Sequence, residues 1–173
     1  MELTMSNIRF TTKNTSLGWM LVAFRENGIC SLTFADHETA AIEELQARFS
    51  SQSISRGTKE EAAEVNRIAD EVEQRGELSS IDLNLDATEF RRRVWSALQQ
   101  IPIGETRTYS EIAEEIGQPT AARAVANACA NNPLAVVIPC HRVVRNDGGL
   151  GGYRWGLERK RELLRREATR KAS

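Results

Sequence analysis

Three stretches near the start of the chain have the apolar pattern of β-strands. They cover residues 7–14, 18–27 and 28–36. The turns between them fall at residues 14–18 and at Asn27-Gly28, and an Asn-Gly pair between apolar runs is a strong signal for a β-hairpin. We therefore expect the chain to begin with strands that are joined by short turns.

Helical spacing of the apolar residues follows these strands. It predicts helices over residues 37–49 and 59–75. The inward positions would be Ala41, Leu45, Ala47 and Phe49 in the first helix, and Ala62, Val65, Ile68, Ala69 and Val72 in the second. The polar residues 50–58 between the helices are interpreted as a linker, and the alternating residues 79–86 as one more strand. This half of the chain carries no obvious catalytic chemistry.

The second half of the chain has a mainly helical pattern. A helix over residues 89–101 would be capped by Asp86 or Thr88. The spacing of Thr108 and Glu111 is that of a capping box, and it predicts a helix that begins there.

Gly117 would end that helix, and Thr120 would cap the next one, over residues 121–132. Two helices joined by a tight turn that contains glycine form a candidate helix-turn-helix. A basic helix is expected to close the chain.

The second helix of the candidate motif carries mostly short side chains. One face would present Arg123, Ala126, Asn127 and Ala130, and another would hold Ala122, Val125 and Cys129. Such a surface suits close approach to a DNA backbone or a narrow groove, with Arg123 inserted as a finger. An alanine-rich packing helix is the structural alternative, and this pattern alone leaves both open.

Charge is distributed unevenly along the chain. Residues 1–86 hold 8 Lys/Arg and 15 Asp/Glu, a net charge of −7, whereas residues 87–173 hold 15 and 9, a net charge of +6. The asymmetry suggests an anionic partner such as nucleic acid for the second half, although a solvated basic helix explains it equally well. We predict two domains with these bounds, of which the first is structural.

Cysteine and histidine usage limits the location and the metal chemistry. Cys30, Cys129 and Cys140 are an odd number of cysteines without the spacing of a disulfide framework, which predicts reduced thiols and a cytoplasmic protein. The chain has two histidines, His37 and His141, and no paired ligand spacing, so we expect no metal. No apolar run reaches the roughly 18 residues that a membrane span needs, so we expect no membrane contact.

A thiol and an imidazole stand side by side within an apolar run at Cys140 and His141. In an extended strand they would point to opposite faces, so a water or a local turn would have to link them. Pro139 is a cause of irregular geometry at this point. Glu167 is one of few acidic residues in this half and could orient the histidine. A buried structural cysteine is the plain alternative.

The sequence around Cys140 resembles that of a known family. The string IPCHRVV is preceded by ARAVANACANNPLAVV and followed by GGLGGYRWGLERKRELLRRE. Together these motifs are similar to the O6-alkylguanine-DNA alkyltransferases, also called methylated-DNA–protein-cysteine methyltransferases, and most of all to the alkyltransferase half of Ada-type proteins. The resemblance is strong over residues 88–167 and weak over the first 86.

The resemblance implies an α+β fold. It would consist of a small ribonuclease-H-like N-terminal α/β domain and a winged-helix-like C-terminal domain that contains the helix-turn-helix. The implied function is DNA repair by irreversible, single-turnover transfer of an alkyl group from O6 of guanine to Cys140. The partner would be double-stranded DNA that carries O6-alkylguanine, bound by a monomer without a cofactor.

The resemblance also assigns roles to single residues. Cys140 would accept the alkyl group, His141 would deprotonate it through a water, and Glu167 would orient His141. Asn132 would brace the turn before the active site, and Tyr109 would donate a proton to the leaving guanine. The DNA-binding residues would be Arg123, Thr120, Ala122, Ala126 and Asn127. The substrate pocket would be lined by Val143, Val144, Tyr153, Arg154 and Trp155.

Two other functions are weighed against this one. A non-catalytic protein that recognises alkylated bases would bind the same DNA without reacting. A thiol hydrolase or peroxidase would turn over a small substrate and would have no need of the helix-turn-helix. The alkyltransferase and the non-catalytic protein are distinguished by whether Cys140 reacts with the alkylated DNA.

Overall fold

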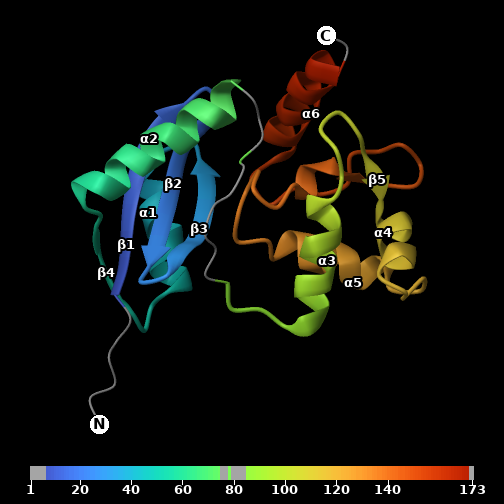
Figure 1. Ribbon diagram of the computed structural model, residues 1–173, viewed down its shortest axis with the longest axis horizontal. Helices are drawn as coiled ribbons and strands as arrows, with labels where there is room; N and C mark the ends of the chain where they lie inside the picture. The colour runs from blue at the N-terminus through green and yellow to red at the C-terminus, as the bar shows by residue number, and fades with distance from the viewer. Residues whose placement is uncertain (1–6, 75–77, 79–84, 172–173) are drawn as a thin grey trace. The chain divides into compact units, whose positions relative to one another are not determined.

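The computed structural model describes residues 7–74, 78 and 85–171. The chain divides into two compact units, Met1–Leu85 and Asp86–Ser173 (Figure 1). The predicted boundary falls one residue later. Most of the strand expected over residues 79–86 lies outside the described residues.

A four-stranded sheet forms the N-terminal unit. Its order is β3-β2-β1-β4, with β1 (Asn7–Thr15), β2 (Gly18–Arg25), β3 (Gly28–Ala35) and β4 (Ser53–Arg56). The first three strands pair antiparallel through the two tight turns that the sequence predicted, and β4 pairs parallel to β1. The mixed sheet confirms the predicted α+β class.

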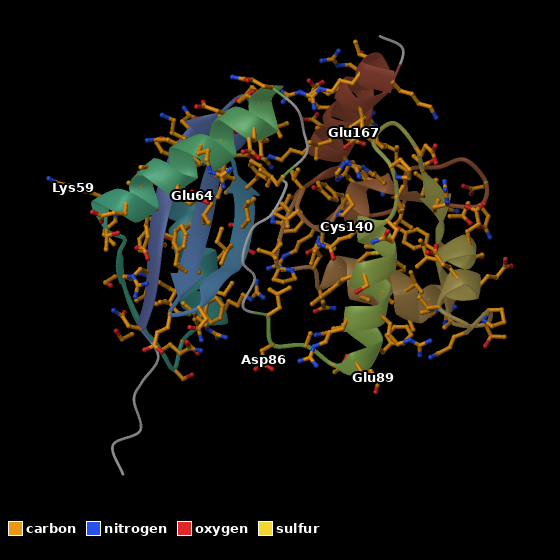
Figure 2. The ribbon with its side chains drawn as sticks, in the orientation of Figure 1. Lys59, Glu64, Asp86, Glu89, Cys140 and Glu167 are labelled. Atoms are coloured by element: carbon orange, nitrogen blue, oxygen red, sulfur yellow. The ribbon has the colours of Figure 1, made fainter. Side chains whose placement is uncertain are left out.

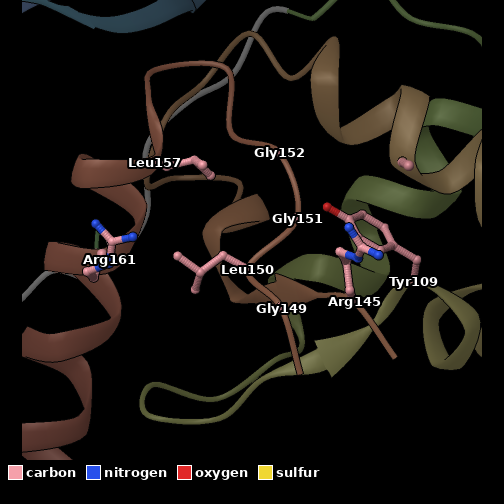
Figure 3. Close-up of a pocket in the computed structure, with 9 residues that line it drawn as sticks. Tyr109, Arg145, Gly149, Leu150, Gly151, Gly152, Leu157 and Arg161 are labelled. Atoms are coloured by element: carbon pink, nitrogen blue, oxygen red, sulfur yellow. The ribbon is translucent and has the colours of Figure 1, made fainter. Parts of the chain in front are cut away.

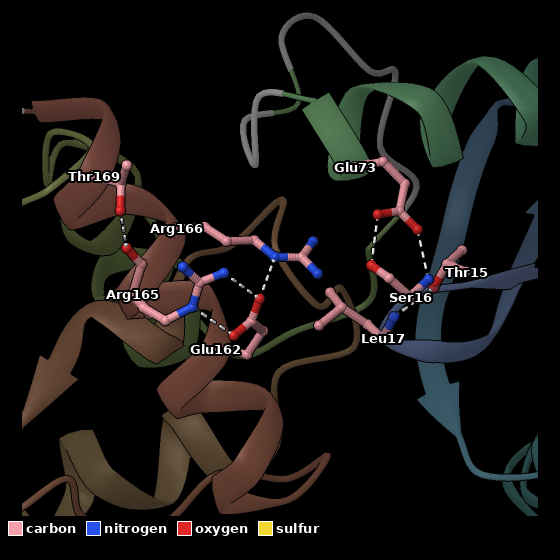
Figure 4. Close-up of polar contacts among 8 residues, drawn as sticks. All are labelled: Thr15, Ser16, Leu17, Glu73, Glu162, Arg165, Arg166 and Thr169. Carbon is pink, nitrogen blue, oxygen red and sulfur yellow. Dashed lines mark hydrogen bonds and ion pairs between the residues drawn. The ribbon is translucent and has the colours of Figure 1, made fainter. Parts of the chain in front are cut away.

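Two helices cover the sheet of this unit. Helix α1 (Glu38–Arg48) packs on β2 and β3, and α2 (Lys59–Gln74) packs on β1, from opposite faces (Figure 1). One face buries Ile8, Phe10, Leu21, Ala23 and Cys30 against Ala41, Leu45 and Phe49. Burial on both faces explains the continuous apolar run in β2. Ser16, in the β1–β2 turn, donates hydrogen bonds to Glu73 of α2, which ties the turn to that helix (Figure 4).

Two expectations for this unit were wrong. The polar segment 50–58 is not only a linker, because β4 lies within it. The strand escaped notice because its four residues are mostly polar, with Ile54 as the sole apolar position. Ala47 was expected to face inward, but it is exposed while Ala41 and Leu45 are buried. Ala47 therefore lies on the solvent side of α1.

The C-terminal unit is mainly helical. Helices α3 (Glu89–Gln99), α4 (Tyr109–Glu115) and α5 (Ala122–Ala130) pack on one another, and α6 (Leu157–Lys171) closes the chain. A short parallel pair, β5 (Arg107–Thr108) and β6 (Val143–Val144), joins the start of α4 to the segment after Cys140. Helices α4 and α5 confirm the predicted helix-turn-helix.

Local capping explains where the helices of this motif begin and end. Thr108 accepts a hydrogen bond from the Glu111 backbone and Glu111 reaches back to Thr108, which confirms the capping box. Gly117 has a φ of 76° and follows α4, as expected for a helix end. The predicted cap of α5 was wrong: Ala121 occupies the cap position, and no side chain caps that helix end.

Two further contacts fix the helices of the C-terminal unit. The buried Trp95 indole on α3 donates a 3.0 Å hydrogen bond to the Ala128 carbonyl of α5. Within α6, Glu162 pairs with Arg165 and Arg166, so part of the basic run is neutralised within the helix (Figure 4). Within the described ranges, no helix is both long enough and apolar enough to cross a membrane.

Candidate active site

Two successive three-residue turns deliver Cys140 to the interior. The Val137 amide donates a 2.8 Å bond to the Ala135 carbonyl around Val136, which has a φ of 69°. The Cys140 amide then donates a 2.7 Å bond to the Ile138 carbonyl around Pro139. A left-handed valine is strained, at a cost of about 1–3 kcal/mol, and such strain persists only where packing holds it.

Cys140 itself begins a 3-10 turn, Cys140–Arg142, and the strand β6 starts only at Val143. The extended geometry considered for residues 138–144 is therefore wrong for the Cys140–His141 step. Pro139 supplies no backbone donor, which favours this irregular geometry.

Asn132 connects this turn to the end of α5. Its side-chain amide donates hydrogen bonds to the Ile138 carbonyl at 2.8 Å and to the Cys140 Sγ at 3.2 Å. Its Oδ1 accepts a 2.8 Å bond from the Leu134 amide. Asn132 is fully buried, so these bonds are made away from water and hold the segment before Cys140 firmly.

His141 and Glu167 form a buried pair across 26 positions of the chain. The His141 Nε2 lies 2.7 Å from the Glu167 Oε1, and a carboxylate there fixes the proton on Nε2. The other ring nitrogen, Nδ1, is buried without a hydrogen-bond partner among the described residues. Figure 2 shows Glu167 on α6 and Cys140 in the interior of the same unit. The histidine can therefore accept a proton at Nδ1.

Arg142 is a residue of this site whose ion pair with Glu167 the sequence analysis missed. Its Nε lies 3.0 Å from Glu167 Oε2 and its Nη2 2.9 Å from Oε1, and its Nη1 donates to the Ile101 carbonyl. The guanidinium thus donates charge-assisted hydrogen bonds to both oxygens of the carboxylate that also pairs with His141. An arginine inside an apolar run was the signal, because a buried cation needs a partner.

Burial and hydrogen bonding set the charge states of the site. Burial raises the pKa of the Cys140 thiol to about 11, although the Asn132 hydrogen bond lowers it in part. Burial also lowers the pKa of His141, against the effect of Glu167. Burial opposes ionisation of Glu167, but hydrogen bonds from His141 and Arg142 prevail and lower its pKa to about 2. The resting site therefore holds a thiol, a neutral imidazole and a carboxylate.

Lys160 is the second residue that sequence reasoning missed. It is fully buried on α6, and its ammonium donates to the carbonyls of Val143 at 2.7 Å, Leu150 at 2.5 Å and Gly152 at 3.1 Å. Lys160, Leu163 and Glu167 are the buried residues of α6 and lie at helical spacing. The available signal was that Lys160 and Glu167 share one helix face with the apolar Leu163, which indicates that both charged residues are buried.

Tyr109, the first residue of α4, lines a cavity of about 600 Å³. The other lining residues are Ala126, Arg145, Gly149, Leu150, Gly151, Gly152, Leu157 and Arg161. Figure 3 shows the Tyr109 hydroxyl directed toward Gly151, with Leu157 and Arg161 on the α6 side. A Cβ at Gly151 would lie 2.7 Å from that hydroxyl, so only glycine permits this approach. Burial raises the pKa of Tyr109 to about 12, which keeps the phenol protonated.

The residues predicted to line a substrate pocket lie in β6 (Val143–Val144) and in the loop just before α6 (residues 153–155). None of the five is among the residues that line this cavity. Val143 and Trp155 are buried, and Val144, Tyr153 and Arg154 are half-buried. Tyr153 stacks edge-on against Trp155 at 5.3 Å and against His141 at 6.5 Å between ring centroids. Its hydroxyl is buried without a partner in the described part of the chain.

The predicted DNA-binding residues lie on α5 and, in the case of Thr120, just before it, and they line two surface hollows. Thr120, Arg123 and Asn127 line a shallow groove of about 720 Å³, together with the start of α3. Ala122 and Ala126 line a smaller hollow of about 360 Å³ that they share with Tyr109. The small side chains of α5 therefore leave space beside the tyrosine. Within the described residues, no group of three or more His, Cys, Asp or Glu is arranged to hold a metal.

The fold and these contacts define a helix-turn-helix protein in which a buried cysteine is hydrogen-bonded to a residue just after the second helix of that motif. A sequence model described as "6-O-methylguanine DNA methyltransferase, DNA binding domain" matches residues 89–169. The Escherichia coli K12 protein "Bifunctional transcriptional activator/DNA repair enzyme Ada" is 44% identical over 161 residues, which are 93% of this chain and 46% of that protein.

The methylated-DNA–protein-cysteine methyltransferase of Mycolicibacterium paratuberculosis is 59% identical over 91 residues, covering 51% of this chain and 55% of that protein. The chain thus spans about half the length of the curated relatives that it matches. The crystal structure of Mycobacterium tuberculosis OGT in complex with DNA has a TM-score of 0.74 and 34% identity, over 95% of this chain and 94% of that one.

The M. tuberculosis O6-methylguanine methyltransferase structure has a TM-score of 0.71 and 35% identity, over 94% of both chains. The chain belongs to the O6-alkylguanine-DNA alkyltransferase family.

Proposed function

We propose that this protein repairs DNA by moving a methyl or larger alkyl group from O6 of guanine in duplex DNA onto Cys140, once and irreversibly. The observation that carries the proposal is the buried thiol, held by Asn132 beside the His141–Glu167 pair. Its membership of the alkyltransferase family supports the same reaction. O4 of alkylated thymine is a second candidate substrate.

The thiol must lose its proton to become a nucleophile. With a pKa of about 11, Cys140 is protonated at neutral pH, so a base has to act during the reaction. His141 is neutral and its Nδ1 has no hydrogen-bond partner in the described part of the chain, while Glu167 holds the opposite nitrogen. We propose that a water carries the proton from Sγ to Nδ1, and that Glu167 stabilises the resulting imidazolium.

The group transfer is then a displacement at carbon. The Sγ electron pair forms a bond to the alkyl carbon while the bond from that carbon to O6 breaks, and the purine leaves with the electrons. Tyr109 is the proton donor to a ring nitrogen of the leaving purine, because its phenol stays protonated near the glycine-rich loop. The product is a thioether that water does not readily cleave, so each molecule acts once and needs no cofactor.

Access to O6 requires that the nucleotide leave the stack. A damaged pair costs less to open, and Arg123 would fill the space left behind. The exposed Arg123 and Asn127, with Thr120, belong to the groove side of α5, and Ala122 and Ala126 allow close approach to a minor groove. The solved complex of the M. tuberculosis relative with DNA supports DNA as the partner.

The proposed class is therefore a methylated-DNA–protein-cysteine S-methyltransferase that is consumed by its reaction. We propose that it acts as a monomer on double-stranded DNA that carries O6-alkylguanine. The residue assignments of the pocket, Val143, Val144, Tyr153, Arg154 and Trp155, remain predictions. A cytoplasmic location also remains a prediction, and the three free cysteines are compatible with it.

Intact-protein mass spectrometry after incubation with duplex DNA containing O6-methylguanine tests the proposal. The wild type should gain the mass of one methyl in place of one hydrogen, and Cys140→Ala should gain nothing. Cys129→Ala is the matched control, since Cys129 is also a buried free thiol, and this variant should still be methylated. Tight binding of the methylated duplex without a mass change would instead favour the non-catalytic damage-recognition function.

A further inference from the structure

Arg154 lies in the loop between the glycine-rich segment and α6, and it reaches back to the end of α5. Its Nη1 donates a 2.8 Å hydrogen bond to the Asn132 carbonyl, across 22 positions of the chain. Its guanidinium carbon lies 5.4 Å from the centroid of the Trp155 ring, within the range of a cation–π contact. One planar group therefore joins the loop to the turn that follows the DNA-reading helix.

Asn132 is the residue on which this contact acts. Its backbone amide donates to the Cys129 carbonyl of α5, and its side chain contacts the Cys140 Sγ. Its carbonyl precedes Pro133, which has no amide hydrogen, so this turn cannot be closed by a bond from that position. Arg154 provides the donor from outside the turn. Displacing the Asn132 backbone would move its side-chain amide away from the thiol.

We propose that Arg154 is a positioning residue that holds Asn132 against the Cys140 thiol and thereby sets the reactivity of that thiol. The inference rests on the proposed transfer to Cys140, but it concerns a residue that the reaction does not consume. It gives Arg154 a role beside the predicted pocket lining, which stays a prediction: its side chain is hydrogen-bonded to the Asn132 carbonyl, and Arg154 is not among the residues that line the cavity beside Tyr109.

The electrostatic surroundings of Cys140 agree with this role. After burial, which raises its pKa, and the Asn132 bond, which lowers it, the positive charges of Lys160 and Arg154 each lower the pKa of Cys140. The other titratable groups that interact with the thiol are Cys129 on α5, Tyr109 on α4 and Tyr153 in the loop. Loss of Arg154 would therefore remove both a cation and the support of a hydrogen bond.

The test compares Arg154→Met, Arg154→Lys and the control Arg165→Met, which removes an exposed arginine that pairs with Glu162 on α6. The first readout is the rate at which iodoacetamide modifies Cys140 as a function of pH, with the site identified by peptide mapping. The second is the methyl-transfer rate at saturating methylated duplex, with duplex affinity and thermal unfolding measured in parallel.

Arg154→Met should slow both reactions of Cys140 about tenfold at neutral pH, the effect of losing one hydrogen bond to a charged group. Its alkylation profile should move to higher pH, while duplex affinity stays unchanged. Arg154→Lys should restore the pH profile in part, because the charge is kept and the planar contact is lost. Arg165→Met should match the wild type in every readout.

A wild-type pH profile and rate in folded Arg154→Met, with only a lower melting temperature, would show a merely structural contact and overturn the inference. Weaker duplex binding with an unchanged rate at saturation would make Arg154 a DNA-binding residue and would overturn it as well. The iodoacetamide profile needs no alkylated DNA. It therefore tests Arg154 even if wild-type protein fails to accept a methyl group.

Discussion

At the scale of single residues, the site combines a buried thiol with a charge network that its neighbours complete. Cys140 is 4% exposed and His141 and Glu167 are at most 1% exposed, so each charge is costly unless it is paired. The Glu167 carboxylate pairs with both His141 and Arg142, so it compensates the buried positive charge of Arg142 and orients the imidazole. Its replacement should affect stability and chemistry together.

We expect Glu167→Gln to lower the free energy of unfolding by about 3–5 kcal/mol, because Arg142 would keep a buried charge without its ionic partner. Methyl transfer should also slow, since the imidazolium proposed to form at His141 would lose its carboxylate. Urea unfolding and single-turnover kinetics measure the two effects. Glu158→Gln, at an exposed position of the same helix, should change neither. If Glu167→Gln transferred methyl at the wild-type rate, Glu167 would have no part in the proposed proton relay.

The same substitution predicts a pH dependence with a definite sign. The folded-state pKa of Glu167, about 2, is below its unfolded value of about 4.3, so its stabilisation is present above pH 4.3 and is lost as the pH falls toward 2. The stability difference between wild type and Glu167→Gln should therefore shrink from about pH 5 downward. A difference that stays constant down to about pH 3 would contradict the lowered pKa.

At the scale of elements, helix α4 brings Tyr109 to the cavity because Thr108 caps it. Thr108→Ala should lower the free energy of unfolding by about 1 kcal/mol, since the Glu111 amide loses its side-chain acceptor. Thr120→Ala is the matched control, because Thr120 does not cap α5. Urea denaturation measures the free energy of unfolding of both variants, and only Thr108→Ala should show the loss. Equal losses would mean that the capping box contributes nothing specific.

Helix α5 carries the proposed flipping residue, Arg123. Arg123→Ala should reduce repair of duplex DNA by about tenfold or more, because the flipped state loses the side chain that fills the gap in the stack. Reaction with free O6-methylguanine base should change little. The ratio of the two rate constants is the measurement, with Arg165→Ala as a variant that loses the same charge. Equal losses on both substrates would show that Arg123 has a structural role.

Element prediction succeeded where a local signal dominates. Asn27-Gly28 and the capping box at Thr108 specify a hairpin and a helix start through their own backbone bonds. It failed where distant contacts decide the conformation. Strand β4 exists through its pairing with β1, and the turn at Cys140 is held by Asn132 and by packing around the left-handed Val136.

The site follows the same division between local and distant information. Cys140 and His141 stand out in the sequence, but the contact with Glu167 spans 26 positions. The scarcity of acidic residues in this half made Glu167 a candidate, and only the family resemblance assigned it to His141. Arg142 and Lys160 were missed because a charged residue is normally taken as exposed, and only the fold supplies their buried partners.

At the scale of the whole molecule, the opposite charges of the two halves should govern DNA affinity. The C-terminal half carries the net positive charge and the proposed DNA-binding residues. The logarithm of the duplex binding constant should therefore fall linearly with the logarithm of salt concentration, with a slope of about −0.9 per phosphate contacted. Fluorescence anisotropy with unmethylated duplex measures this slope. Affinity that is independent of salt would contradict an electrostatic interface.

The proposed transfer to Cys140 is single and irreversible, so the number of methyl groups accepted per protein molecule is the decisive measurement. The protein would be titrated with an excess of duplex carrying isotopically labelled O6-methylguanine, and the label would be followed by peptide mapping. The predicted result is a plateau at one methyl per protein molecule, located on Cys140, with Cys129 and Cys30 unlabelled. Continued turnover beyond one equivalent, or a plateau with the label on another residue, would contradict it.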